Sequence, residues 1–311
     1  TLAAFKCAEL LQPDLLILET GLGGRLDAVN LVAADIAVIT TVDFDHQDWL
    51  GNDLVSIARE KAGIIHNNSI AIIGDPEFPQ LIIDEIKCLT DKLHIAGDEY
   101  QHQSLKDSWI WQNREYGPWK FKHPTFPYTN ASAAIQAWSL LHKIFSESIS
   151  NFVEISEQFI RNALANIVLQ GRFEMVATKP DVILDVAHNP QAFRALLIAL
   201  EKQPFKGKTH VVLGMLTDKK VKDCIEPFKT LVDQWYLTDI KSSRGNTVFE
   251  LIQIFSHSGF DRNRLQCHSS PLEAYHAACD NASKDDRIIV TGSFYTVAPV
   301  LDFFQKLQMN Q

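Results

Sequence analysis

The segment that most restricts the fold is a short apolar run that ends in one carboxylate and a glycine-rich turn. Leu15-Leu16-Ile17-Leu18 carries no charge, Glu19 follows it, and Gly21-Leu22-Gly23-Gly24 comes soon afterwards. An uninterrupted apolar run of this length is typical of a parallel strand that is buried on both faces between helices. Ligands of such α/β sheets bind beyond the carboxyl ends of the strands. The pattern therefore predicts an α/β fold with Glu19 at the ligand-binding edge.

A second apolar run repeats this arrangement. Residues 36–42 form a strand-like segment, and Asp43, Asp45 and His46 follow it. Neighbouring parallel strands would bring these side chains and Glu19 to one crevice, and hard divalent cations prefer oxygen ligands and tolerate an imidazole. Taken alone, Glu19 is better interpreted as a strand-end residue that caps the next turn. Together with the Asp45-His46 pair, the pattern favours a metal site.

Lys61 occurs in the helical segment Ala58-Arg59-Glu60-Lys61-Ala62-Gly63. The ordinary interpretation of a single charge in such a segment is a solvated helix face. The small residues Ala62 and Gly63, however, let another backbone pack closely beside the helix. We therefore expect Lys61 to be buried and functional.

The chain is long enough for two domains, because 311 residues exceed the usual size of a single core. The alternation of strands and helices starts again after Gln170-Gly171, so we predict one domain at 1–169 and a second at 170–311. Strands are expected at 15–18, 36–42, 69–74, 181–186, 209–213, 234–237 and 287–291. Helices are expected at 52–62, 76–92, 130–145, 156–166, 190–202, 219–232, 247–257, 271–283 and 295–307, and an antiparallel excursion within 98–127.

The second half also ends a strand in a carboxylate. Asp185 follows Ile183-Leu184, and His188 comes shortly before Pro190, which suits the first position of a helix. Asp185 can accept a hydrogen bond from a ribose hydroxyl, and His188 can face a phosphate or a carboxylate. Arg172, directly after Gly171, could reach a phosphate across an interdomain cleft. A lone Arg at a linker is more often a surface residue, and that alternative stays open.

Composition excludes several classes of protein. A formal net charge of −9 argues against a nucleic-acid partner, which would need a basic stripe. The five cysteines lack CxxC spacing, which indicates idle thiols in a reducing compartment. The sequence has no signal peptide and no apolar run of membrane-spanning length, so we expect a cytoplasmic protein. A dinucleotide motif is also disfavoured, because Leu26 replaces the third glycine of G-x-G-x-x-G.

Taken together, these blocks resemble the folylpolyglutamate synthase/dihydrofolate synthase family, within the Mur-ligase-like superfamily of ATP-dependent amide ligases. They run in family order along almost the whole chain, and the version most similar to this sequence is the bacterial bifunctional enzyme. The matching blocks are Glu19-Thr20-Gly21-Leu22-Gly23-Gly24-Arg25-Leu26-Asp27, Asp45-His46, Leu50-Gly51, Arg59-Glu60-Lys61-Ala62-Gly63-Ile64, Gly171-Arg172-Phe173, Asp185-Val186-Ala187-His188-Asn189-Pro190 and Gly292-Ser293-Phe294.

The resemblance implies a fold and roles for individual residues. The fold would be a P-loop-type, mostly parallel sheet like the Mur-ligase central domain, followed by a Rossmann-like α/β domain. In the first domain, Glu19 and His46 would bind Mg²⁺, and Lys61 would be carbamylated and help to hold a second Mg²⁺. Asn130 would contact adenine, and Arg172 and Asp185 would contact ATP. His188 would lie near the γ-phosphate and the incoming glutamate.

The implied reaction adds L-glutamate to dihydropteroate or a reduced folate. ATP phosphorylates the pteridine-linked carboxylate, and the glutamate amine then attacks the acyl phosphate. The phosphate loop and the pterin loop of the family do not occur in the sequence, and Val29 stands where family members commonly have Thr. We expect both loops to lie upstream of Thr1, the first sheet to be truncated, and these 311 residues alone to be inactive.

Two other functions stay open at the level of sequence. A Mur-type ligase that acts on a cell-wall nucleotide precursor would use the same chemistry on a different acceptor. A non-catalytic remnant would bind a nucleotide or a partner only. For the leading interpretation we expect ATP and Mg²⁺ as cofactors, a monomer, and no membrane partner.

Overall fold

The computed structural model describes residues 1–309 apart from 46, 125, 146–154, 168 and 204. The chain divides into two compact units, Thr1–Asn166 and Ile167–Gln311. Each unit has its own sheets and its own hydrophobic clusters, and each is described by itself below. No helix in the described ranges combines the length and the apolar content needed to cross a membrane.

The first unit contains a parallel sheet and an antiparallel sheet with helices packed on them. Strands β1, β2 and β3 pair in that order and in parallel, while β4, β5 and β6 form the antiparallel sheet. The elements are α1 (Leu2–Leu11), η1 (Ala28–Leu31), β1 (Ile36–Ile39), α2 (Gln47–Leu50), α3 (Leu54–Ala62), β2 (Ile70–Ile73), α4 (Gln80–Lys87), β3 (Leu93–Ile95), β4 (Tyr100–Ser104), β5 (Trp109–Asn113), β6 (Trp119–Phe121), α5 (Tyr128–Phe145) and α6 (Glu157–Ala165).

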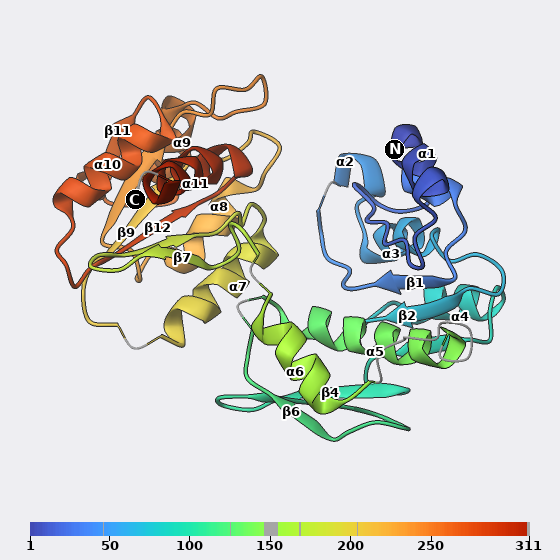
Figure 1. The fold of residues 1–311 in the computed structure, drawn as a ribbon. Helices are drawn as coiled ribbons and strands as arrows, with labels where there is room; N and C mark the ends of the chain where they lie inside the picture. Colours follow the sequence, from blue (N-terminus) through green and yellow to red (C-terminus); the bar gives the residue numbers. More distant parts are fainter. Residues whose placement is uncertain (46, 125, 146–154, 168, 204, 310–311) are drawn as a thin grey trace. The chain divides into compact units, whose positions relative to one another are not determined.

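Alternation along the parallel strands explains how helices cover both faces of this sheet. Ala71 and Ile73 pack with α3 and α4 on one face. Ile72, between them, points to the other face and packs with α5. Helix α5 lies between the parallel sheet and the antiparallel sheet, whose buried Trp109 and Trp111 contribute to the same core (Figure 1). The sequence predicted the antiparallel excursion and this helix.

The strand predicted at 15–18 is not formed. The segment is irregular, and Ile17 is 84% exposed. Within the described residues, β1 pairs only with β2, and the 15–18 backbone forms no ladder of hydrogen bonds with the other edge of β1. An apolar run becomes a strand only where a neighbour accepts and donates those bonds.

Other boundaries of the first unit also differ from the sequence prediction. Strand β1 ends at Ile39 rather than at residue 42, because the amide of Val42 donates to Asp75 Oδ2 (3.1 Å) instead of continuing the ladder. Helix α5 begins at Tyr128 rather than at Asn130, since the amide of Asn130 already donates to the Pro127 carbonyl (3.0 Å). Strand β3 was not predicted. Its three residues are too few to show a period.

The second unit is a six-stranded sheet between two layers of helices. The strand order is β11-β10-β9-β12-β8-β7, in which only β7 is antiparallel to its neighbour. The elements are β7 (Glu174–Ala177), β8 (Asp181–Leu184), α7 (Pro190–Glu201), β9 (Thr209–Leu213), α8 (Val221–Ile225), η2 (Glu226–Phe228), β10 (Gln234–Thr238), α9 (Val248–His257), η3 (Arg262–Arg264), β11 (Leu265–His268), α10 (Pro271–Asn281), β12 (Arg287–Thr291) and α11 (Phe294–Met309).

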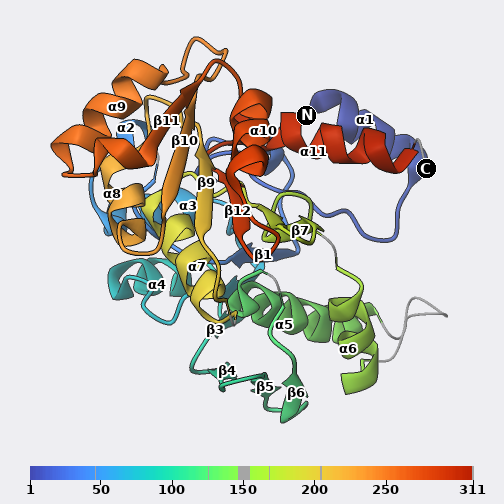
Figure 2. The ribbon, with the colours of Figure 1, turned by 90° about the vertical axis from the view of Figure 1, so that its left-hand side faces the viewer.

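The two faces of this sheet carry separate cores. Ile289 and its neighbours on one face pack against α7, α8 and α9. Ile288 and Val290 pack against α10 and α11 on the other face (Figure 2). This is the Rossmann-like α/β layering that the sequence predicted, with all four expected strands present. The edge strands β7 and β11 were missed, and the helix expected at 219–232 is broken, because Pro227 cannot continue the hydrogen-bonding pattern of α8.

Candidate functional site

The glycine-rich segment of the first unit is a compact loop organised by Asp27. One carboxylate oxygen of Asp27 accepts hydrogen bonds from the amides of Gly21 (2.8 Å) and Leu22 (3.2 Å). The other accepts from the amide of Val29 (2.9 Å). These bonds lower the pKa of Asp27 below its usual range, since they stabilise the carboxylate, and the bond from Val29 has the largest effect on the pKa. The loop is therefore closed on itself by an ionised side chain.

This loop lies directly against the end of helix α3. The amide of Arg25 donates to the Glu60 carbonyl (2.8 Å), and its guanidinium bonds Glu60 Oε1 (2.9 Å). A Cβ atom at Gly24 would lie 2.8 Å from the Lys61 carbonyl oxygen, so only glycine permits this approach. Two motifs that the sequence analysis singled out separately are thus in backbone contact.

Lys61 lies in the last turn of α3 and is half-buried. Burial lowers the pKa of its ammonium group, and the negative charge of Asp45 partly opposes this shift. A lowered pKa increases the neutral, nucleophilic fraction of a lysine at neutral pH. The electrostatic interaction also shows that the residues after β1 lie near the end of α3, as expected for groups at one edge of a sheet.

The metal site predicted at Glu19 and His46 is only partly described. Glu19 is exposed in the irregular segment before the glycine-rich loop, and His46 lies outside the described residues. Among the residues that the structure does describe, no three His, Cys, Asp or Glu side chains are grouped so as to hold a metal ion. The donor chemistry, a carboxylate with an imidazole, suits a hard divalent cation. Their role as ligands stays a prediction.

Asn130 lies in the first turn of α5 and is exposed. Its amide side chain offers a donor and an acceptor to solvent, which are the groups that an adenine edge can pair with. The predicted contact with adenine stays a prediction.

In the second unit, Asp185 binds the segment that precedes β7 to the end of β8. Its carboxylate accepts hydrogen bonds from the amides of Phe173 (2.9 Å) and Ala187 (2.8 Å). Gly171, at φ +65°, accepts from the Val186 amide (2.8 Å) through its carbonyl oxygen, which adds a second link. Burial raises the pKa of Asp185, whereas the two amides and the charges of Arg172 and His188 oppose that shift.

The structure therefore brings Arg172, Asp185 and His188 together at the carboxyl edge of the second sheet. The ring of His188 is oriented by its Nδ1, which donates to the Val186 carbonyl (2.9 Å). In the neutral ring this leaves Nε2 as an acceptor. The loop then enters α7, where Asn189 caps the Ala192 amide and Pro190 takes the first turn. A cation, a carboxylate, an imidazole and a helix N-terminus at one sheet edge suit a nucleotide or another anion.

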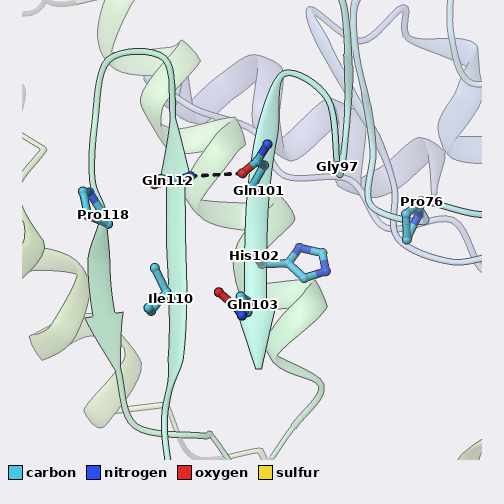
Figure 3. Close-up of a pocket in the computed structure, with 8 residues that line it drawn as sticks. All are labelled: Pro76, Gly97, Gln101, His102, Gln103, Ile110, Gln112 and Pro118. Carbon is cyan, nitrogen blue, oxygen red and sulfur yellow. Dashed lines mark hydrogen bonds between the residues drawn. The ribbon is translucent and has the colours of Figure 1, made fainter. Parts of the chain in front are cut away.

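Sequence reasoning missed an open hollow on the first unit, lined by both polar and apolar residues. It has a volume of about 470 Å³ and contains no residue predicted for the site (Figure 3). The alternation of Gln101 and Gln103 along β4 is the signal that could have placed their side chains on one exposed face. None of the described residues that line the hollow carries an acidic or basic charge of Asp, Glu, Lys or Arg, which does not suit an anionic ligand. The lining residues are Pro76, Gly97, Gln101, His102, Gln103, Ile110, Gln112 and Pro118.

Comparisons with known proteins agree with these features. A family model described as Mur ligase, glutamate ligase domain, matches residues 171–294. The dihydrofolate synthase/folylpolyglutamate synthase of Escherichia coli (strain K12) is 37% identical over 302 residues, which are 97% of this chain and 68% of that enzyme. The enzyme with the same description from Haemophilus influenzae is 33% identical over 317 residues, covering 96% of this chain and 70% of that protein.

Solved structures extend the comparison to the fold. The structure of E. coli FolC in complex with DHPP and ADP matches with a TM-score of 0.86 at 36% identity and covers 99% of this chain and 70% of that one. A bifunctional folylpolyglutamate synthase/dihydrofolate synthase with Mn, AMPPNP and L-glutamate bound matches with a TM-score of 0.82 at 35% identity, over 97% of this chain and 70% of that one. Both comparisons confirm the resemblance inferred from the motifs. The chain belongs to the family of bifunctional dihydrofolate synthases/folylpolyglutamate synthases.

Proposed function

We propose that this chain serves the ATP-dependent ligation of L-glutamate to dihydropteroate and to reduced folates. The observation that carries the proposal is the similarity to enzymes of this activity, which spans both units at 37% identity. The relatives whose structures hold DHPP with ADP, and Mn with AMPPNP and L-glutamate, support the two kinds of substrate and a divalent metal.

The proposed reaction has two chemical steps. The carboxylate of the pterin substrate attacks the γ-phosphate of ATP, and ADP leaves. The amine of glutamate then attacks the acyl phosphate, and phosphate leaves as the amide forms. A divalent cation, when bound, would offset the charge that builds up as a phosphoryl group meets a carboxylate. Glu19 and His46 would hold it.

We assign Lys61 to the same end of the first unit. Its lowered pKa supports reaction of the neutral amine with carbon dioxide, which forms a carbamate and releases one proton. The carbamate would be an anion at the end of α3, where the unmodified lysine is a cation. The change from a cation to an anion would let Lys61 help to hold a metal ion, which a solvated helix residue would not do.

In the second unit, three residues would bind the nucleotide and the incoming amino acid. Asp185, already fixed by the amides of Phe173 and Ala187, would accept a bond from the ribose, and Arg172 beside it would pair with a phosphate. His188, oriented through Nδ1, would face the γ-phosphate and glutamate. Asn130 of the first unit would contact adenine.

We also propose roles for the two domains, a cellular compartment and an oligomeric state. The first domain, 1–169, would be the ATPase and central ligase domain, and 170–311 would be the C-terminal ligase domain. We propose a cytoplasmic monomer. The net charge of −9 argues against a nucleic-acid partner.

The test is ligation of radiolabelled glutamate by the intact enzyme. Product is expected with dihydropteroate and with a reduced folate, and none with a cell-wall nucleotide precursor. Lys61→Ala should lower turnover by about 100-fold or more, as for other groups that stabilise transition-state charge, and short carboxylic acids should partly restore it. Lys87→Ala, at an exposed position of α4, is the control. Turnover of Lys61→Ala within a few-fold of the wild type would contradict the role of Lys61.

A further inference from the structure

We infer that Asn30 is a positioning residue, whose side chain holds the loop that follows Glu19 against the end of helix α3 that carries Lys61. The inference rests on the proposed function, in which Glu19 and Lys61 serve one site. Asn30 follows the glycine-rich loop. It is identified by its contacts.

The side chain of Asn30 joins three segments. Its Nδ2 donates to the carbonyl of Gly63 at the end of α3 (2.9 Å) and to the carbonyl of Arg25 within the loop (3.1 Å). Its Oδ1 lies 2.9 Å from Nε2 of His66, which follows the helix. Because Oδ1 only accepts, His66 Nε2 carries the proton of this bond.

These partners require an amide. Two carbonyl oxygens need donors, and one imidazole N–H needs an acceptor, so Asn30 meets all three with one planar group. An aspartate would keep the bond to His66 and place a carboxylate oxygen against two carbonyl oxygens. An apolar residue of similar size would leave all three groups without this partner, at least two of them in a half-buried place.

Other contacts between the loop and the helix depend on close approach rather than on strong pairing. The ion pair between Arg25 and Glu60 is solvent-exposed, with 53% and 24% of the side chains accessible, and such pairs contribute little. A Cβ atom at Gly63 would lie 2.3 Å from Cβ of Arg25, so the two backbones touch where Asn30 bonds them. Loss of the Asn30 bonds would leave the loop held to α3 by the bond from the Arg25 amide to the Glu60 carbonyl (2.8 Å) and by the exposed ion pair between these two residues, so that it can move more freely.

Two sets of hydrogen bonds hold the loop, one within it and one to helix α3. Asp27 closes it on itself through the amides of Gly21, Leu22 and Val29. Asn30 bonds it to the helix. Without the Asn30 bonds the loop stays formed but can move relative to α3. Glu19, two residues before Gly21, moves with the loop.

The test uses Asn30→Asp, with Asn67→Asp as the control, because Asn67 is exposed and gains the same charge. Hydrogen exchange followed by mass spectrometry should become about ten-fold faster in residues 21–31, where the Arg25 amide bonds Glu60, and stay unchanged in α4. Mn²⁺ binding, followed by the electron paramagnetic resonance signal of the free ion, should weaken by about 10-fold or more, as for other residues that orient metal ligands. A merely structural role would speed exchange in α4 as well.

Exchange and Mn²⁺ binding equal to those of the Asn67→Asp control would overturn the inference. Glu19→Gln separates it from the proposed function. If Glu19→Gln leaves Mn²⁺ binding unchanged, the proposed metal role of Glu19 fails. In that case, faster exchange at 21–31 in Asn30→Asp would still support the inference that Asn30 holds the loop against α3. Unchanged exchange at 21–31 would overturn that inference. Should Asn30→Asp not fold, Asn30→Ser, which keeps one donor, replaces it and should show the same effects at smaller size.

Discussion

Replacement of Asp185 by alanine should destabilise the second unit independently of any ligand. In the structure the carboxylate accepts two backbone hydrogen bonds, from Phe173 (2.9 Å) and from Ala187 (2.8 Å), and it is half-buried. Alanine removes both acceptors and leaves two amide groups without them. The segment that precedes β7 then loses a link to the end of β8.

The size of the effect follows from those two bonds. A hydrogen bond to a charged group contributes about 1.5–3 kcal/mol. Since water can reach part of this half-buried place, we expect Asp185→Ala to lower the free energy of unfolding by about 3 kcal/mol, near the lower bound for two such bonds. For a domain of this size, that loss corresponds to a fall in Tm of about 6–12 °C.

Hydrogen exchange followed by mass spectrometry measures this in the intact chain, because it reports each unit separately. Exchange in β8 and α7 should accelerate strongly, and exchange in the parallel sheet of the first unit should not change. Asp302→Asn, at an exposed position of α11, is the control. A loss in Asp185→Ala smaller than about 0.5 kcal/mol, the range of ordinary surface substitutions, would refute the assigned bonds.

The pH dependence gives a second, independent check on Asp185. Burial raises the pKa of this carboxyl in the folded state, so the folded state binds more protons than the unfolded state between the ordinary carboxyl pKa and the raised one. The free energy of unfolding contributed by this group therefore falls as pH rises through that window. Asp185→Asn does not titrate, so urea midpoints measured across the window should show a weaker decline in the variant than in the wild type.

Two further predictions concern backbone contact and buried charge. Gly63→Ala should destabilise the first unit by about 1–3 kcal/mol in urea unfolding, since the new Cβ would lie 2.3 Å from Cβ of Arg25. Gly21→Ala is the control and should be nearly neutral, because its Cβ would lie 3.5 Å from the nearest atom. Equal effects of the two substitutions would contradict the contact between Gly63 and Arg25. Burial lowers the pKa of His210 in the folded state, although the nearby Asp286 opposes this shift. Below the ordinary histidine pKa of about 6.5, the unfolded state therefore takes up a proton that the folded state does not, and the free energy of unfolding should fall as pH drops. His210→Gln should weaken that fall between pH 7.5 and 5.5, and an unchanged slope would show that His210 is not its source.

Much of the fold could be predicted because it depends on local patterns. The apolar runs of β8, β9, β10 and β12 have few polar interruptions, and each is followed by a helical period. The α/β class and the four central strands of the second unit followed from that alternation. The edge strands could not be found in the same way. β11, Leu265–His268, mixes polar and apolar residues because part of each edge strand meets solvent.

The motifs also indicated which residues belong together, but not how they are held. Arg172, Asp185 and His188 were predicted for one site from their order along the chain, and the structure places them in electrostatic contact. Asp185 was predicted as a ligand group, and only the structure shows that both of its oxygens already bond backbone amides. For Glu19 and His46, proximity stays a prediction.

By itself, the sequence determined the family, the fold class and the order of the chemical groups along the chain, because these depend on residue type and spacing. Tertiary structure alone decided that Leu15–Leu18 is not a strand, that the glycine-rich loop rests on α3, and that Asn30 fastens it there. A strand needs hydrogen bonds from a neighbour, and a pKa depends on burial. Both are set by residues distant in the sequence, which local patterns do not encode.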